Sequence, residues 1–213
     1  MYWTRSIVVL LFAFAGSAAA AEYSLPFKGR WFVMQGGDTP NVNHHMAVRA
    51  QYFGVDFAKV GGPTERSLTK GPGVALDNFY GWHEPVMAPV DGEVVTAADS
   101  FPDNPVGTHD TDHPFGNHVV IKTADGAYVF LAHFSTGTIK VKPGQRVSVG
   151  DVLGLCGNSG NSDFPHIHMH VQDSLGAGAA GMNVQFAHMD VELTGKQFRD
   201  VTWPVIRGLF VSD

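Results

Sequence analysis

The segment His166–Gln172 carries three histidines that alternate with apolar residues. A period of two is typical of a β-strand, in which successive side chains point to opposite faces. The strand would therefore have an imidazole face and an apolar face, made of His166, His168 and His170, and of Ile167, Met169 and Val171. Several imidazoles on one face of a strand indicate a metal site or an acid–base site.

A metal site needs further ligands from elsewhere in the chain, because a catalytic zinc ion takes about three protein ligands and keeps one position open for water. Asp56 is the candidate oxygen ligand. It lies between Val55 and Phe57, where an unpaired carboxylate would be costly to bury; a structural, hydrogen-bonded aspartate is the alternative. The candidates for the third ligand are His44 and His45, a pair that could equally be solvated surface.

Two further residues carry weaker indications. His133 lies at the end of an apolar run, where a histidine more often packs than reacts, and it becomes a candidate catalytic group only in the company of the other histidines. Cys156 is the only cysteine, which excludes an internal disulfide. Its apolar surroundings predict a strand with a small buried thiol rather than a nucleophile.

Short runs rich in β-branched and aromatic residues alternate with Gly, Pro and Asn turns. This pattern predicts an all-β fold built on an antiparallel sheet or a partly open barrel. The predicted strands are Trp31–Gln35, Tyr52–Ala58, Val86–Ala88, Gly92–Ala97, His118–Thr123, Tyr128–Phe134, Arg146–Val149, Val152–Cys156 and His166–Gln172. Two long loops, Lys59–His83 and Asp99–Asn117, are expected to form the walls of a groove. Residues 174–213 are expected to begin with a small-residue excursion and then to close the same sheet, with strands around Val184–Phe186 and Val201–Leu209.

Residues 1–21 have the order of a secretory signal peptide: a basic start, an apolar run from Ile7 to Ala15, and small residues up to Ala21. The apolar run is too short for a permanent membrane span, and a buried first helix is the alternative. We therefore expect residues 22–213 to form a single secreted or periplasmic domain that is not an integral membrane protein. With 14 basic and 20 acidic residues, the chain is not expected to bind nucleic acid.

Several motifs follow one another in a fixed order between Asn43 and Gln172. They are Pro85–Val95, Gly116–Ile121, the Tyr-x-x-x-Ala-His stretch Tyr128–His133, Val141–Gly154, Gly157–Ser162 and the Pro-His-Ile-His stretch Pro165–His168. Together they resemble the lysostaphin-type zinc metallopeptidases, also called LytM-type murein endopeptidases. Agreement of several motifs in order and spacing makes this resemblance far more specific than any one of them.

The resemblance implies the lysostaphin-type peptidase fold, one zinc ion per chain and hydrolysis of peptide bonds in peptidoglycan cross-bridges or stem peptides. Position by position, Asp56 matches the aspartate ligand of the family, and His168 matches the ligand histidine of its His-x-His motif. His166 and His133 match two histidines that contact the zinc-bound water or the transition state.

The third ligand departs from the commonest form of the family, in which a histidine stands four residues before the aspartate. Here that position is Tyr52. An upstream Asn-x-His segment, as in the members similar to this chain, predicts His45 instead, with His44 as the fallback. His170 stands where the family often has glutamate, so it is expected at most to support a ligand or to line the groove.

Bound zinc lowers the pKa of a water molecule toward about 7 and so provides a nucleophile at neutral pH. Because the ligand imidazoles must be neutral, activity is expected to fall in acid. Tyr52 keeps open an alternative, a catalytically inactive relative that binds peptidoglycan or activates a cell-wall amidase. Residues 88–92 and 141–154 also look like hairpins of biotinyl and lipoyl carrier domains. Such carriers need an exposed lysine at a hairpin tip, and no such lysine lies between these two segments, so a carrier function is disfavoured. The scissile bond, the oligomeric state and the need for an activating protein stay open.

Overall fold

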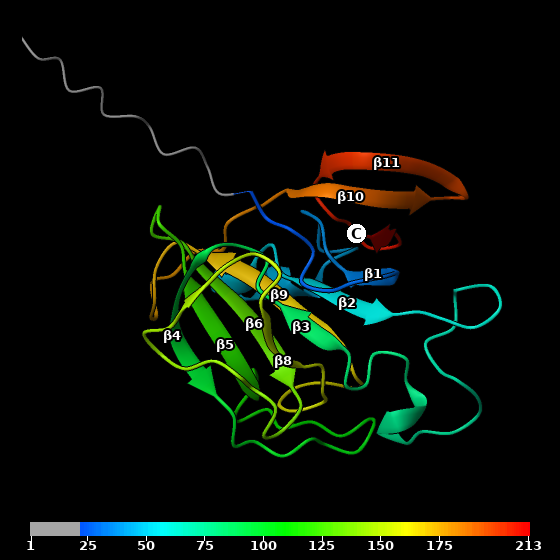
Figure 1. Cartoon of the computed structure of the whole chain (residues 1–213), viewed down its shortest axis with the longest axis horizontal. Coiled ribbons are helices and arrows are strands. Elements are labelled where there is room, and N and C mark those ends of the chain that lie inside the picture. Colours follow the sequence, from blue (N-terminus) through cyan, green and yellow to red (C-terminus); the bar gives the residue numbers. More distant parts are fainter. Residues whose placement is uncertain (1–21) are drawn as a thin grey trace, which may run out of the picture.

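The computed structural model describes residues 22–213, so the predicted signal peptide, residues 1–21, lies outside the described residues. The described chain contains twelve β-strands and three short 3-10 helices (Figure 1). The strands are β1 (Trp31–Gln35), β2 (Val55–Lys59), β3 (Pro85–Met87), β4 (Gly92–Ala98), β5 (Asn117–Lys122), β6 (Tyr128–Phe134), β7 (Arg146–Val147), β8 (Val152–Leu155), β9 (Ile167–Gln172), β10 (Phe186–Leu193), β11 (Lys196–Trp203) and β12 (Phe210–Ser212). The 3-10 helices are η1 (His44–Ala47), η2 (Arg49–Gln51) and η3 (Leu76–Asn78).

Ten strands form one sheet in the order β11-β10-β12-β1-β2-β9-β6-β5-β4-β7, and β3 pairs with β8 in a separate two-stranded sheet. Every pair of neighbouring strands is antiparallel. Strands β11 and β7 stand at opposite edges, so the sheet is open and does not close into a barrel. The prediction of an all-β, antiparallel fold is confirmed.

The C-terminal segment closes this same sheet, as predicted, but the predicted strand boundaries were wrong. Strands β10 and β11 form a hairpin over residues 186–203, seen at one end of the molecule in Figure 1, and residues 204–209 connect it to β12. The hairpin turns at Thr194 and Gly195, both with positive φ. This combination matches the tight turn favoured in hairpins, but Thr is a poor signal for it, so the sequence did not reveal the turn.

The core lies against the apolar face of the sheet. Ile167, Met169 and Val171 of β9 are buried there, as the alternating pattern predicted. Phe57 of β2 packs edge-on against Phe27, with ring centroids 5.0 Å apart. Because β9 has β2 and β6 as its two neighbours, the opposite face of β9 is held at the centre of the sheet.

Candidate metal centre

Strand register places Asp56 directly beside His168. The two residues are paired across β2 and β9, and paired residues project from the same face of a sheet. Val55 and Phe57 point into the core, so Asp56 points to the imidazole face. The Asp56 Oδ1 atom lies 2.9 Å from His168 Nδ1, and both side chains are buried. Two strands distant in sequence thus bring a carboxylate and an imidazole together.

His45 reaches the same carboxylate from η1. Its Nε2 atom lies 3.0 Å from Asp56 Oδ2, and its ring centroid lies 4.5 Å from that of His168. The side chain of Asn43 fixes this position: its Oδ1 accepts from the backbone N–H of His45, and its Nδ2 donates to Gly37 O and Gly54 O. Asn43 is therefore the N-cap of η1 and ties it to β2, a role that the sequence analysis did not identify.

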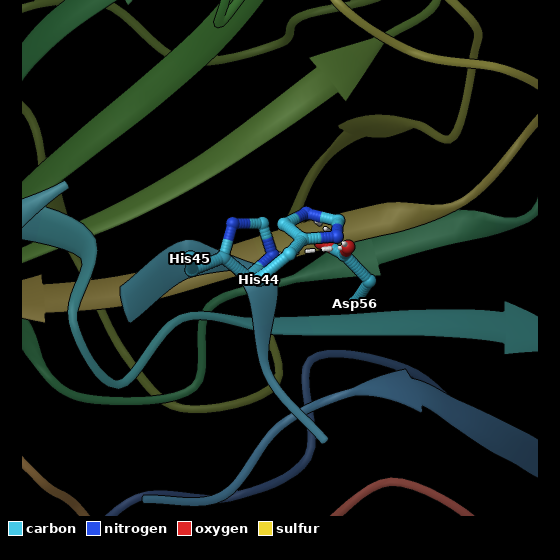
Figure 2. Close-up of side chains that lie close together, drawn as sticks. All are labelled: His44, His45 and Asp56. Carbon is cyan, nitrogen blue, oxygen red and sulfur yellow. Dashed lines mark ion pairs between the residues drawn. The ribbon is translucent and has the colours of Figure 1, made fainter. Parts of the chain in front are cut away.

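His44 lies on the outer side of the same carboxylate. Its Nε2 atom is 3.9 Å from Asp56 Oδ2 and its side chain is 65% exposed, against 10% for His45. Figure 2 shows both rings beside the Asp56 carboxylate, where the three side chains form a cluster able to hold a metal ion. His168 lies closer to Asp56 than His44 does, so the imidazoles of His44, His45 and His168 all surround this one carboxylate.

The donor geometry fits a small cation. Within residues 22–213, His45 Nε2 is buried and makes no hydrogen bond, although it lies 3.0 Å from Asp56 Oδ2. Ligand atoms about 2.0–2.1 Å from a tetrahedral zinc ion lie about 3.3 Å from one another. The spacings from Asp56 to His45 and to His168 are slightly shorter than this value. A buried nitrogen without a partner, aimed at a carboxylate, is thus the arrangement that a bound cation would satisfy.

Neighbouring imidazoles keep Asp56 ionised, and burial keeps His168 neutral. Burial alone would raise the pKa of Asp56, but the imidazoles of His45, His168 and His166 hold that pKa well below its usual range. Burial lowers the pKa of His168 to about 3, with the charge of His45 acting in the same direction. Both side chains therefore have, at neutral pH, the protonation state that a metal ligand requires.

Gly54 allows the two candidate ligand rings to pack against the start of β2. A Cβ atom at this position would lie 3.0 Å from His45 Cγ and 3.1 Å from His168 Cε1, tight contacts that would push the two rings from their positions. The backbone must approach the two rings here, and glycine is the residue that permits it.

His133 faces this site because the end of β6 is irregular. Its φ of 67° is uncommon for a residue other than glycine. In a regular strand His133 would follow Val129 and Leu131 into the core, but Phe134 takes that place instead. The extra residue turns the His133 ring toward His166, with ring centroids 4.8 Å apart. The sequence predicted His133 as a site residue, but not the distortion that aims it.

Backbone carbonyls fix the rings of His133 and His166. His133 Nδ1 lies 2.8 Å from Ser159 O, and His166 Nδ1 lies 2.8 Å from Phe164 O. Because a carbonyl can only accept, each neutral ring carries its proton on Nδ1 and has a lone pair on Nε2. His166 Nε2 is 3.7 Å from Asp56 Oδ1, so this lone pair lies beside the metal-capable cluster and can accept a proton. Burial, with the charges of His166 and His168, holds the pKa of His133 well below its usual value, so it too is neutral at neutral pH.

A cavity of about 750 Å³ opens over these side chains. Its walls include residues of β1, η1, the loop 99–117, the loop 157–166 and the segment before β12. The prediction of a groove wall is confirmed for Asp99–Asn117, which contributes Phe115. Within the described chain, no lining residue comes from Lys59–His83. Instead Phe79 stacks on Phe164 at 5.3 Å and supports the wall from behind.

Cys156 is separate from this chemistry, as predicted. Its thiol is buried, and burial, with smaller effects of Glu84 and Asp103, raises its pKa well above the usual range. We expect the native protein to react slowly with a thiol reagent at mildly alkaline pH and the denatured protein to react fast, as followed by absorbance. Equal rates in the two states would contradict this account.

Comparison with known proteins gives the family. The sequence profile of peptidase family M23 matches residues 71–184, more than half of the chain. His45 and Asp56 precede the matched segment, whereas His133, His166 and His168 lie within it.

Three curated relatives agree in part of their length. The cell division protein DipM of Caulobacter vibrioides is 32% identical over 88 residues, 41% of this chain and 12% of DipM. The glycyl-glycine endopeptidase ALE-1 of Staphylococcus capitis is 30% identical over 108 residues, 50% of this chain and 26% of ALE-1. The peptidoglycan DD-endopeptidase ShyA of Vibrio cholerae is 43% identical over 58 residues, 27% of this chain and 13% of ShyA. The matched part thus spans about a quarter or less of each relative.

Among solved structures, a glycyl-glycine endopeptidase lytM described from Ruminococcus gnavus is 18% identical, with 76% of this chain and 57% of that chain covered at a TM-score of 0.48. This score is too low to add to the family assignment. The sequence match to residues 71–184 is sufficient on its own: the chain belongs to peptidase family M23.

Proposed function

We propose that this protein is a zinc metalloendopeptidase that hydrolyses peptide bonds in peptidoglycan. The observation that carries the proposal is the convergence of His45, Asp56 and His168, three donors from three elements, at the floor of the cavity. Family membership supports a peptidase. Nitrogen and oxygen donors in this number suit a catalytic zinc ion that keeps one position open.

His45, rather than His44, is proposed as the third ligand. The His45 ring is buried, its Nε2 has no other partner in the described chain, and Asn43 fixes its backbone. A site composed of buried donors gives zinc a dry, preorganised environment, which an exposed ring such as that of His44 does not. His44 is then a residue of the cavity wall.

When bound, zinc would lower the pKa of a water molecule and polarise the scissile carbonyl. The protein's own histidines accept and return the proton. The Nε2 lone pair of His166 or of His133 takes up the one proton released on attack, because the Nδ1–H of each ring donates to a carbonyl. The imidazolium so formed stabilises the developing oxyanion and can return the proton to the leaving amine.

The substrate class rests on the relatives. ALE-1 is a glycyl-glycine endopeptidase and ShyA a peptidoglycan DD-endopeptidase, and both match parts of this chain. A peptidoglycan substrate also agrees with the predicted secreted or periplasmic location and with a single domain over residues 22–213. Among those residues, no helix reaches the length and apolarity needed to cross a bilayer.

The test is digestion of purified murein by the chain from residue 22 onward. We expect new amine groups to appear with the zinc-loaded protein, to fall to background after chelation, and to return when zinc is added back. Mass spectrometry of the released fragments identifies the bond that is cut. Release of amines that continues unchanged after full chelation would reject the proposal.

Arg207 is expected to contribute to substrate binding. It supplies the one Lys or Arg side chain among the described residues that line the cavity, and it forms no ion pair within them. Peptidoglycan stem peptides carry carboxylates, which a guanidinium binds well. The Arg207→Ala variant should raise KM about tenfold with little change in kcat, as measured on soluble murein peptides. An unchanged KM would show that Arg207 does not meet the substrate.

The alternative, a catalytically inactive relative, was suggested by Tyr52, which occupies the usual histidine position. In the structure Tyr52 is exposed and lies in the turn before β2, while His45 stands beside Asp56. The replaced histidine therefore does not leave the carboxylate without an imidazole donor. The activating protein considered from the sequence stays an open prediction.

A further inference from the structure

Buried hydrogen bonds connect His168 to the end of β9. His168 Nε2 lies 2.9 Å from His170 Nδ1, and His170 Nε2 lies 3.2 Å from the side-chain oxygen of Gln172. Gln172 Nε2 then donates to the carbonyl oxygen of Ser174 over 2.6 Å. The three side chains belong to alternate residues on the imidazole face of β9, and all three are buried.

The carbonyl oxygen of Ser174, at the end of this series of hydrogen bonds, fixes which group donates and which accepts in each of them. Because Ser174 O can only accept, the amide of Gln172 must present its NH₂ group to Ser174 and its oxygen to His170. His170 therefore donates from Nε2 and accepts at Nδ1. His168 must in turn donate its Nε2–H to His170, which leaves the Nδ1 lone pair of the neutral ring facing Asp56.

With the hydrogen bonds in this direction, two acceptor atoms, His168 Nδ1 and Asp56 Oδ1, face each other. His168 Nδ1 and Asp56 Oδ1 are 2.9 Å apart, yet a neutral His168 that donates to His170 has no proton left for Asp56. A cation between the two atoms turns this conflict into two ligand bonds. The order of bonds along β9 therefore selects a His168 tautomer suited to metal binding and unsuited to a hydrogen bond with Asp56.

The ring of His170 cannot easily turn out of this arrangement. It stacks on Phe130 at 4.6 Å and 15° between ring planes, and on Phe115 at 5.6 Å and 27°. Phe130 is its cross-strand partner on β6. Phe115 comes from the groove-wall loop, so the stack also joins this loop to the sheet.

We infer that His170, held by Gln172, is a positioning residue that sets the tautomer and orientation of His168 and thereby strengthens metal binding. The inference rests on the proposed zinc site and deepens it. His170 touches neither Asp56 nor His45 through any hydrogen bond in the described chain, so its effect passes through His168.

The test compares zinc dissociation constants, measured by competition with a chelating dye on metal-free protein. His170→Phe keeps an aromatic ring between Phe115 and Phe130 but removes the acceptor. His170→Asn keeps an acceptor at nearly the position of Nδ1 but removes the ring. We expect His170→Phe to weaken zinc binding about 10–100-fold relative to the parent. His170→Asn should bind zinc at least about tenfold more tightly than His170→Phe does.

Gln172→Met provides a second variant further from the metal. It removes the acceptor that orients His170 while leaving both imidazoles in place, so it should weaken zinc binding by less than His170→Phe. Nitrogen NMR of the zinc-loaded parent should show His168 with a slowly exchanging proton on Nε2 and none on Nδ1. In His170→Phe, the Nε2 proton should exchange rapidly with water.

Equal zinc affinity of the parent and His170→Phe would overturn the inference, as would a proton on His168 Nδ1 in the zinc-loaded parent. An equally large loss in His170→Asn would show that an acceptor at this position does not restore zinc binding, and would also overturn the inference. The proposed function fails separately: a parent that binds zinc but does not cleave murein rejects that function, while the order of affinities still decides the role of His170.

Discussion

His45→Ala is expected to lose its bound zinc and to show no murein hydrolysis above background. The variant removes one of three proposed donors and leaves Asp56 and His168 as the remaining two. Metal analysis of the purified protein should give about one zinc per chain in the parent and none in the variant. Circular dichroism checks that the variant is folded.

His44→Ala is the matched control, because it removes the neighbouring imidazole from the same short helix. The His44 side chain is largely exposed and stands farther from the carboxylate, so this variant is expected to keep its zinc. Loss of zinc from His44→Ala with retention in His45→Ala would reverse the ligand assignment and contradict the account given for η1.

Removal of either proton-accepting histidine should abolish most of the activity without removing the metal. His166→Ala and His133→Asn are each expected to reduce kcat about 10²–10⁴-fold, the usual contribution of a positioned acid–base group. Asparagine is chosen at position 133 because it tolerates a positive φ better than alanine does. Zinc content should remain about one per chain in both variants.

The two variants also separate positioning from chemistry. If either one lost its zinc together with its activity, that histidine would be holding the metal rather than moving a proton. A kcat equal to that of the wild type in both variants would contradict the roles assigned to His133 and His166. Catalysis would then depend on the metal site of His45, Asp56 and His168 alone.

The local part of the site could be predicted from the sequence. The alternation in His166–Gln172 correctly placed His168 and His170 on one face of β9, with His166 directly before the strand, and three apolar side chains in the core. Asp56 stood out for a different reason, because a carboxylate between Val55 and Phe57 would be costly to bury without a partner. Both inferences need only the local sequence of one strand.

Features that depend on contacts distant in sequence could not be predicted in the same way. His45 was preferred over His44 only through the family resemblance, and in the structure this preference rests on Asn43, whose side chain joins η1 to Gly54. The orientation of His133 rests on an extra residue in β6. The direction of the His168–His170–Gln172 bonds depends on one carbonyl, that of Ser174. Register, bulges and hydrogen-bond direction are properties of tertiary structure, and single-sequence patterns do not specify them.

The most direct measurement is an anomalous difference map from a crystal grown with zinc, recorded at the zinc absorption edge. We expect one peak, about 2.0–2.2 Å from His45 Nε2, from an Asp56 carboxylate oxygen and from His168 Nδ1. No peak at Asp56 under zinc-replete conditions, or a peak held by His44 with the His45 ring turned away, would contradict it.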